Sequence, residues 1–343
     1  MTTMFQPRYS PRFAVEVGSR TFQEPGGRIA DLVVETTLSG ADRFSFTLNY
    51  PFDEELGEFS GLDWSTFEIG TAVEIAMGYG GDGTLTPLLT GSIASIHSEF
   101  TTDNGPTVTV SGFGLLKELM NGTDSRSWEE TTEELTVGRA VEEILSAYPF
   151  ATVDVRDADI KRVKLIQDNQ SDYRFLEALA DHYGFSFYAE RDTVRFHPRS
   201  GRGNDREPVV ELWYGEALHD FYAEITDTRD DHRIEVRSWD AEAGQEIIAT
   251  AGAKTAANTE VFRVPVISQN EAQRIAEKKH SRHADGRITG HGEADGTPEI
   301  RAGELICLEE LGERFSGQYY VTNATHRMGA AGYRTTFEAT EVA

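Results

Sequence analysis

Short segments at both ends of the chain alternate apolar and polar residues, and this period of two limits the possible folds more than any other feature. The pattern occurs in RFSFTLNY (43–50), AVEIAMGY (72–79) and TVTVSGF (107–113), and it returns in RIEVRSWD (233–240) and YRTTFEATEV (333–342). Glycine, asparagine and proline residues separate these segments. Such alternation is typical of antiparallel strands with one buried face, so the sequence predicts a β-rich protein.

The middle of the chain has helical periodicity instead. A helix is predicted after Thr136, which can cap it, because apolar residues recur there at a spacing of 3.6. A second helix begins at the N-cap residue Ser171 and ends at Gly184, which suits the left-handed position after a helix. Two strands follow it as a predicted hairpin. Between the linkers 119–133 and 199–208 we therefore expect a compact α+β module.

Two stretches on either side of this module, residues 67–113 and 299–340, loosely repeat one another. Each contains a glycine, an alternating strand, a glycine loop, a second strand, a hairpin and a third strand. The matched positions are Gly70 with Gly303, and His97 with His326. The economical interpretation is two copies of one antiparallel unit with the module between them.

This repeat predicts how the domains are divided. We expect a first β unit over 1–118, an inserted α+β domain over 119–200 and a second β unit over 201–343. The second unit should carry a helical insertion near 251–297, whose helix starts with the capping box Ser268-x-x-Glu271.

Composition excludes several classes of protein. The formal net charge of −26 argues against nucleic acid as a partner, because phosphate binding needs basic patches. Only 6 of the 32 basic residues are lysine, which suits a protein working in high salt, although GC-rich coding would also favour arginine. A single cysteine, Cys307, excludes a disulfide framework and a Cys-based zinc site, and we expect it to be buried. We expect neither a secretory signal nor a membrane span.

Two groups of residues could be taken for binding sites. Gly78–Gly83 matches G-x-G-x-x-G, but a strand rather than a helix follows it, so we interpret it as a hairpin loop. His280, His283 and His291 lie near Asp285 and are weak candidates for metal ligands. The alternative is a solvated helix end, where histidines complement the helix dipole.

A third group is acidic. Asp227, Asp230 and Asp231 precede His232 and could form a catalytic carboxylate cluster, or the polar tip of a hairpin. No G-x-S-x-G, H-E-x-x-H or Walker-type segment is present. We therefore predict no catalytic residue and no cofactor, and we expect a protein that is not an enzyme.

The stretch QDNQSDYRFLEALADHYGFSFYAE (167–190) resembles a signature of the late control protein D family, the central baseplate hub of contractile phage tails and related injection systems. PEIRAGELICL (298–308), SGQYYVTNATH (316–326) and GYRTTF (332–337) are similar to that family too, as are PRYSPRFAVEVGSR and LLTGSIASIHSEF near the N-terminus. The signature residues, to which we assign structural roles, are Gln167, Asn169, Ser171, Asp172, Phe175, Leu176, Tyr183, Gly184, Gly303, Gly317 and His326.

The resemblance implies two tail-tube-like antiparallel β-barrels with a small α+β domain inserted between them. Three chains then present six near-equivalent barrels, so that a homotrimer can join a sixfold tail tube to a threefold spike. It implies a component of a virion tail or phage-tail-like particle, assembled in the cytoplasm, with the tube protein, a spike protein and other baseplate proteins as partners. Because no oligosaccharide-binding barrel, β-helical repeat or lysozyme-like segment follows the second unit, we expect the spike to be a separate protein.

Two rival functions stay open at this point. One is a metal- or carboxylate-dependent hydrolase that uses the acidic cluster near Asp227 and the late histidines. The other is a tail-fibre or receptor-binding module. If the hub interpretation holds, the net charge suggests an acidic lumen wall that repels nucleic acid.

Overall fold

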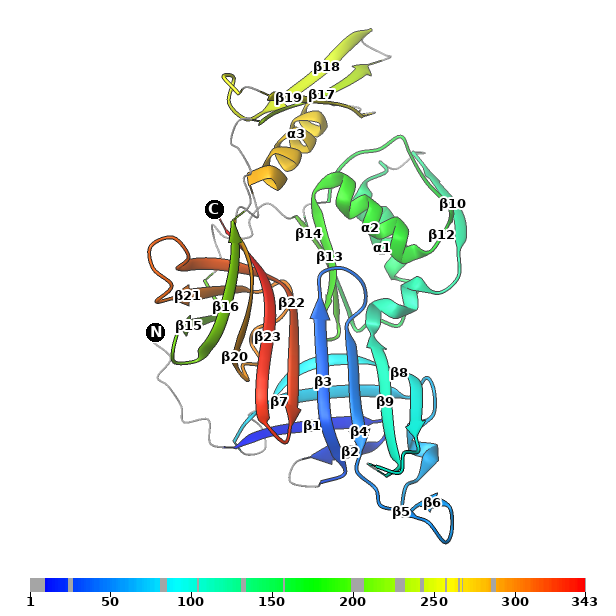
Figure 1. The fold of residues 1–343 in the computed structure, drawn as a ribbon. Coiled ribbons are helices and arrows are strands. Elements are labelled where there is room, and N and C mark those ends of the chain that lie inside the picture. Colours follow the sequence, from blue (N-terminus) through cyan, green and yellow to red (C-terminus); the bar gives the residue numbers. More distant parts are fainter. Residues whose placement is uncertain are drawn as a thin grey trace.

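One large curled antiparallel sheet dominates the computed structural model of the chain (Figure 1). Strands far outnumber helices, so the predicted β-rich α+β fold class is confirmed. The structure describes residues 10–23, 27–80, 85–103, 105–130, 134–156, 158–198, 207–225, 232–240, 244–256, 258–264, 266, 268–284 and 288–342.

The first β unit contains seven strands of this sheet, in the spatial order β3-β4-β9-β8-β7-β1-β2. Their inward side chains form one core, in which Phe46, Val73 and Ile75 are fully buried. The elements are β1 (Pro11–Val17), β2 (Arg20–Gln23), β3 (Ile29–Thr37), β4 (Arg43–Leu48), β7 (Ala72–Tyr79), β8 (Thr86–Glu99) and β9 (Thr107–Gly114), with the small hairpin β5 (Phe52–Asp53) and β6 (Glu58–Phe59) and the 3-10 helix η1 (Trp64–Phe67) between β4 and β7.

The second β unit adds six strands. Four follow the order β16-β20-β23-β22, while β21 pairs with both β22 and β15. A separate core, which includes Leu212, Ile306 and Phe337, fills this unit. The strands are β15 (Val210–Trp213), β16 (Leu218–Ile225), β20 (Ile288–Asp295), β21 (Leu305–Glu309), β22 (Gly317–Gly329) and β23 (Gly332–Glu341).

The two units share the sheet because β22 pairs with β3 in antiparallel register, from Asn323 opposite Thr37 to Met328 opposite Leu32. In place of the two expected barrels, the chain has two curled β units that are joined edge to edge into one sheet of 13 strands. Periodicity could not predict this junction, because it depends on which strand edges meet.

The two units have the same strand order. β1-β7-β8-β9-β4-β3 in the first corresponds to β15-β21-β22-β23-β20-β16 in the second. Every corresponding neighbour pair is antiparallel except the outermost, where β1 runs antiparallel to β7 but β15 runs parallel to β21.

Local details repeat as well. The Gly70 N–H donates to the carbonyl oxygen of Ile93 at 2.8 Å, and the Gly303 N–H donates to that of Val321 at 3.0 Å. Immediately after Ile93 and Val321, both long strands carry a bulge in their pairing with the next strand. The predicted match of Gly70 with Gly303 is therefore correct.

The shared bulge also corrects the second predicted match. Counting from it places Ser98, not His97, at the position of His326. His97 is exposed whereas His326 is completely buried, so the two histidines do not play the same part.

The inserted α+β unit packs its helices and strands around its own apolar core. Thr136 caps its first helix by accepting from the Arg139 N–H at 3.2 Å, and Gly184 ends its second at φ +85°. The elements are η2 (Leu115–Met120), β10 (Asp124–Glu129), α1 (Val137–Leu145), β11 (Thr152–Val155), β12 (Lys164–Gln170), α2 (Asp172–Tyr183), β13 (Phe185–Glu190) and β14 (Thr193–Pro198).

One predicted linker is wrong. The segment 119–133 contains β10, which pairs with β12. Trp128 anchors this strand, because its ring stacks on Phe175 of α2 with centroids 5.5 Å apart. The polar composition of the segment did not predict this strand, whose one large aromatic side chain packs on α2.

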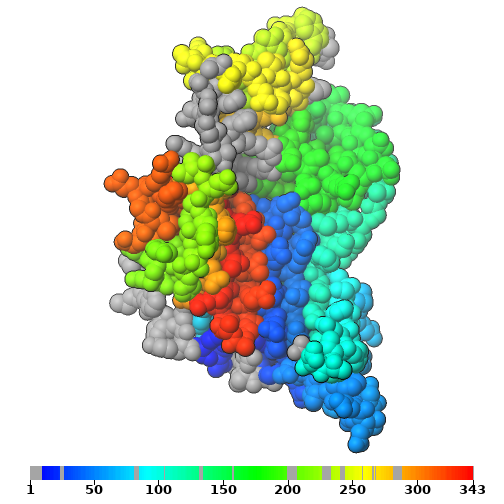
Figure 2. All heavy atoms as spheres, in the orientation of Figure 1, coloured from blue at the N-terminus to red at the C-terminus, as the bar shows by residue number. Residues whose placement is uncertain are grey.

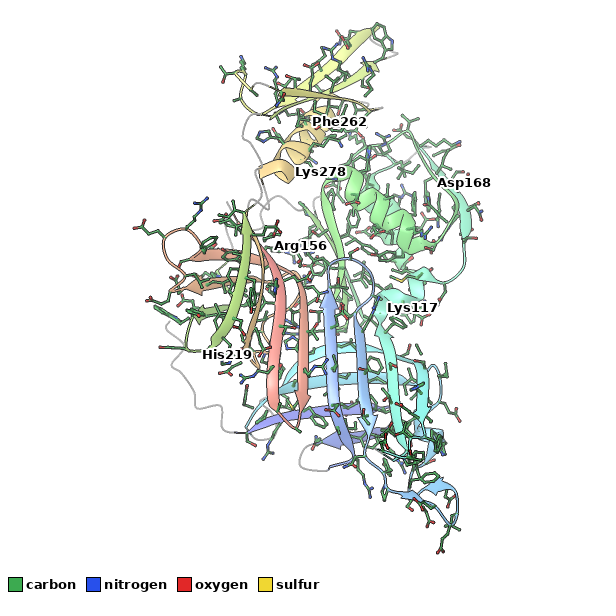
Figure 3. The ribbon with its side chains drawn as sticks, in the orientation of Figure 1. Lys117, Arg156, Asp168, His219, Phe262 and Lys278 are labelled. Atoms are coloured by element: carbon green, nitrogen blue, oxygen red, sulfur yellow. The ribbon has the colours of Figure 1, made fainter. Side chains whose placement is uncertain are left out.

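A further unit protrudes at one end of the molecule (Figure 1). Its helix packs on a three-stranded sheet of order β18-β17-β19, and together they enclose a fourth core. Lys278 and Phe262 mark the helix and the sheet in Figure 3. The helix and the strand at 233–240, which is β17, were predicted, but the two strands that pair with it and their separate sheet were not. The elements are β17 (His232–Asp240), β18 (Gln245–Ala251), β19 (Asn258–Arg263) and α3 (Gln269–Ala284).

Within the described ranges, no helix is long and apolar enough to cross a membrane.

Candidate functional site

The signature segment forms a buried polar network around Asp172. Its carboxylate accepts hydrogen bonds from Gln167 Nε2 and the Tyr148 hydroxyl, both at 2.7 Å, and pairs with the Arg126 guanidinium. Burial alone raises the pKa of Asp172, but the hydrogen bonds from Gln167, Tyr148 and Arg126 outweigh it, and the pKa lies below its ordinary value. The carboxylate therefore stays charged and tied down, as a structural group does.

The other signature residues of this segment also build structure. The Ser171 hydroxyl accepts from the Arg174 N–H at 3.3 Å at the start of α2. Asn169 adopts a positive φ of +45° and accepts from the Thr123 hydroxyl at 3.1 Å. The apolar members lie in the core of the inserted unit: Phe175, Leu176 and Tyr183.

His326 lies completely buried on β22. Its Nε2 lies 3.0 Å from the carbonyl oxygen of Ile300, while Nδ1 lies 2.9 Å from the Tyr333 hydroxyl and 3.1 Å from that of Thr335. A carbonyl can only accept, so Nε2 carries the proton and Nδ1 accepts from a hydroxyl. Burial lowers the pKa of His326 to about 3, so the ring is neutral. This histidine ties the loop before β21 to the sheet.

That loop, residues 297–304, is where three parts of the molecule meet. The buried Arg301 places Nη1 3.4 Å from the Pro87 carbonyl oxygen of β8 and Nη2 3.5 Å from Glu190 of β13. The Ala302 N–H donates to the Thr36 hydroxyl of β3 at 3.0 Å. The neighbouring Gly303, at φ +92°, packs against the Tyr188 ring. The junction therefore sets the inserted unit against both β units.

The remaining signature glycine, Gly317, begins β22 opposite Leu308. The signature residues thus lie in the polar network, at helix ends and strand ends, in the core of the inserted unit and near the junction. Sequence reasoning assigned them structural roles, which stays a prediction.

The metal candidates lie on separate elements. His280 is on α3 and His291 on β20, where its ring stacks on Tyr222 at 4.7 Å. The His283 side chain and Asp285 lie outside the described residues. Among the residues that are described, no three histidine, cysteine or acidic side chains gather as metal ligands.

Two other predicted groups fall in the same undescribed parts. The second half of the glycine loop, residues 81–83, and the acidic cluster at Asp227, Asp230 and Asp231 lie outside the described ranges. Cys307 is half-buried rather than buried, and desolvation raises its pKa to about 12, so its thiol is protonated and unreactive at neutral pH.

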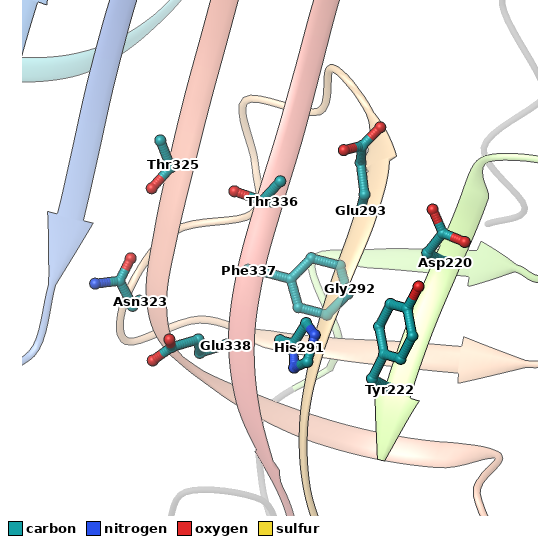
Figure 4. Close-up of a pocket in the computed structure, with 10 residues that line it drawn as sticks. All are labelled: Asp220, Tyr222, His291, Gly292, Glu293, Asn323, Thr325, Thr336, Phe337 and Glu338. Atoms are coloured by element: carbon teal, nitrogen blue, oxygen red, sulfur yellow. The ribbon is translucent and has the colours of Figure 1, made fainter.

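A shallow groove opens on the second unit, with a volume of about 350 Å³ (Figure 4). Tyr222 and His291 form one wall, and the carboxylates of Asp220, Glu293 and Glu338 lie around it. The groove lies on the outward face of β16, β20, β22 and β23, opposite the core. It is part of a larger polar surface rather than an enclosed pocket.

That surface continues across both units, because directly opposed residues share one face of a sheet. One row runs from Thr336 to Thr325, Glu35 and Arg43. In a neighbouring row the hydroxyls of Ser95 and Ser111 lie 3.1 Å apart. We call this outward face, rich in hydroxyls and carboxylates, the polar face of the sheet.

An aromatic tip projects below the first unit, seen at the bottom of Figure 2. The rings of Phe52 and Phe59 contact Phe100, with centroids 5.6 and 6.2 Å apart. Phe100 is nevertheless 64% exposed and Leu56, at the turn of the hairpin, is 70% exposed. From Phe44 to Leu116 the chain has ten acidic residues and no lysine or arginine. Exposed apolar patches are found at the binding surfaces of many proteins.

Comparison with known families decides the wider relationship. The model of the family described as Alg8 N-terminal domain matches residues 52–329, well over half of the chain. The chain belongs to the Alg8 N-terminal domain family. The matched range takes in parts of both β units and the whole inserted unit between them. No curated protein matches the sequence.

Solved structures similar to this Alg8-family chain include tail proteins and a type VI secretion component. The tail protein from Neisseria meningitidis MC58 superimposes with a TM-score of 0.71 at 14% identity, over 97% of each chain. The 43 kDa tail protein of prophage MuSo2 from Shewanella oneidensis gives 0.69 at 11% identity, also over 97% of each. A type VI secretion component of E. coli, described as similar to the T4 phage tail proteins gp27 and gp5, gives 0.60 at 13% identity, over 96% of this chain and 75% of that one.

These likenesses confirm the fold and the predicted resemblance to phage tail and injection-system proteins. Sequence reasoning missed three features of this Alg8-family chain: the Arg301 junction, the β22–β3 pairing and the exposure of Tyr222 and Phe100. Arg301 stands inside a stretch that resembles the family, PEIRAGELICL, but its partners are far away in sequence. No local pattern could have identified them.

Proposed function

We propose that this chain is the structural hub of a tail or injection-system baseplate, and that three copies form a pseudo-sixfold ring between a sixfold tail tube and a threefold spike. The observation that carries the proposal is the strand-for-strand correspondence of the two β units within one sheet. A chain with two near-equivalent units presents six such units when three copies assemble. That is the number a sixfold tube requires.

The similar tail proteins support this proposal, because their folds match along nearly the whole chain. The structural roles of the signature residues are compatible with a protein that works through its surfaces. On this view the molecule binds no cofactor and catalyses no reaction. The division into 1–118, 119–200 and 201–343, with a second insertion that carries α3, is part of the proposal.

We further propose that the polar face of the sheet lines the lumen of the ring. Carboxylates outnumber cations in the described part of this face around the groove, where Asp220, Glu293 and Glu338 gather. Short hydroxyl side chains elsewhere on the face, such as Ser95 and Ser111, leave a smooth wall. A negative wall repels nucleic acid and other polyanions and disfavours sticking of acidic cargo.

The experiment that tests the hub is a mass measurement by light scattering on the purified full chain, alone and with its spike protein. We expect three copies of the 38.1 kDa chain in each particle, either free or bound to the spike protein, in at least one of the two samples. A monomer or dimer in both samples contradicts the proposal. Cell-surface binding by the isolated chain would favour a receptor-binding module instead.

A further inference from the structure

The sheet has two unpaired edges that the internal duplication relates to one another. β16 is the last strand on one side, and no described strand pairs with its outer edge. On the other side, β8 pairs with β7 only through residues 86–92, so residues 94–99 lack a described partner on that edge. β16 and β8 lie on opposite flanks of the molecule (Figure 1).

Within the chain, the equivalent edges are joined. β16 corresponds to β3, and the second half of β8 corresponds to the second half of β22. β3 and β22 pair in antiparallel register and close the contact between the two units. The two free edges therefore correspond to the two strands that pair at the β22–β3 junction. Within one chain this junction forms once, and its second equivalent stays unpaired.

The burial of side chains also differs between the paired edge and the unpaired edges. On β22, Ala324 and His326 are fully buried and Met328 is 5% exposed, because β3 covers them. The shared bulge places Phe100 at the position that corresponds to Met328, and Phe100 is 64% exposed. On β16, Tyr222 corresponds to Val33 of β3 and is 61% exposed. The exposed Phe100 ring is explained if a strand is missing from the edge of β8, while Tyr222 lies in the groove of the polar face on the strand that would supply it.

We propose that β16 of one copy adds to residues 95–99 of β8 in the next copy, in the register that β3 uses on β22. This inference rests on the proposed trimer and specifies its interface. Within one copy, Glu35 of β3 lies opposite Thr325 of β22, and Val34 lies opposite His326. Transfer of this register places Glu224 opposite His97 of the neighbouring copy, and Ala223 opposite its Ser98.

The occupant of each edge is thus a second copy of this chain. The added contact pairs backbone groups of both edge strands, which otherwise invite uncontrolled strand addition, and it brings Phe221 of one copy beside Phe100 of the next. Three such contacts alternate with three intrachain β22–β3 contacts. The ring then has six near-equivalent junctions, and the edges of β16 and of residues 95–99 of β8 are paired.

A disulfide between opposed strands tests the register. In the full chain, His97→Cys combined with Glu224→Cys should form bonds between copies, because opposed residues on neighbouring strands lie within reach of a disulfide. The natural Cys307 should not interfere, since its thiol is protonated and half-buried. Mild oxidation of trimer isolated by mass, alone or with the spike protein, should give covalent dimer and trimer on a non-reducing gel.

Two control variants calibrate the result. Glu35→Cys with Thr325→Cys is the intrachain counterpart, and it should form its disulfide within one copy and leave the mass of each chain unchanged. His97→Cys with Ala223→Cys differs from the test pair by one residue, so its sulfurs face opposite sides of the sheet and it should not cross-link.

A trimer in which the intrachain control pair oxidises but the test pair does not overturns this inference and leaves the proposed hub intact. Cross-linking of the slipped pair instead of the test pair overturns the register. Absence of any trimer in both samples overturns the hub and the interface together. Cross-linking by the test pair alone, into covalent trimers, supports the interface.

Discussion

Replacement of Gly303 by alanine should destabilise the protein more than the same change at Gly70, its counterpart in the first unit. Both glycines have positive φ, +92° and +87°. An L side chain there adds backbone strain of about 1–2 kcal/mol at either position. The backbone cost is therefore shared by the two variants, and their surroundings decide the difference.

Those surroundings differ sharply. Nothing lies within 4 Å of a Cβ added at Gly70, whereas a Cβ added at Gly303 would lie 2.8 Å from Cε2 of Tyr188. Tyr188 is buried against the junction, so its ring has little room to move. Overpacking of this kind costs about 1–3 kcal/mol, which is the expected excess of Gly303→Ala over Gly70→Ala.

Urea unfolding followed by circular dichroism measures the two free energies, and hydrogen exchange in β13 reports whether the loss is local to the junction. Adding Tyr188→Leu to Gly303→Ala should recover part of the loss, and adding it to Gly70→Ala should not. If both alanine variants lose the same stability, the contact of Gly303 with Tyr188 does not hold the inserted unit in place.

Three other outcomes are expected. Leu179→Ala should cost about 2–4 kcal/mol, because the side chain is buried in the core of the inserted unit; the matched change Val163→Ala, at an exposed site, should alter the urea midpoint little. Asp172→Asn should lower the melting temperature and increase proteolysis between β10 and β12, since Arg126 and Gln167 then lose a charged acceptor. Two buried groups should give opposite pH dependences. Burial lowers the pKa of His326 from 6.5 to about 3, so below pH 6.5 the unfolded chain binds a proton that the folded chain does not. The stability that the neutral His326 ring contributes is therefore lost as pH falls, by about 2 kcal/mol between pH 7.5 and 5. Burial raises the pKa of Asp42 from 3.8 to about 7, so the folded chain binds the extra proton and stability falls as pH rises through that range. Urea midpoints of His326→Gln and Asp42→Asn across this range should therefore differ from the parent with opposite slopes, and parallel curves would contradict both assignments.

Strands and helix ends were predictable because their signals are local. The alternation in 72–79 gives β7 with identical bounds, and Ser171 and Gly184 cap α2 as expected. Local chemistry is enough in these cases, since a cap bonds to residues three positions away and an alternating strand needs only one apolar face.

Predictions failed where a distant partner decides the outcome. β10 pairs with β12, and its Trp128 stacks on Phe175, almost fifty residues along the chain. The Ser268 hydroxyl accepts from the Glu271 N–H at 3.2 Å, as the capping box predicts, but the spacing did not reveal that the Glu271 carboxylate accepts from Arg162 of the inserted unit at 2.6 Å. The ion pair links α3 to that unit, and the spacing of residues along the sequence could not predict it.

The sequence by itself determined that the chain is β-rich, that it contains one antiparallel unit twice and that a helix-bearing module separates the copies. Only the tertiary structure decided that β22 and β3 join the copies into one sheet and that β16 and half of β8 remain open. Periodicity shows which face of a strand is buried, because side chains alternate between the two faces. It does not show which backbone edges meet, because every strand offers the same N–H and C=O groups along its edges whatever its side chains are.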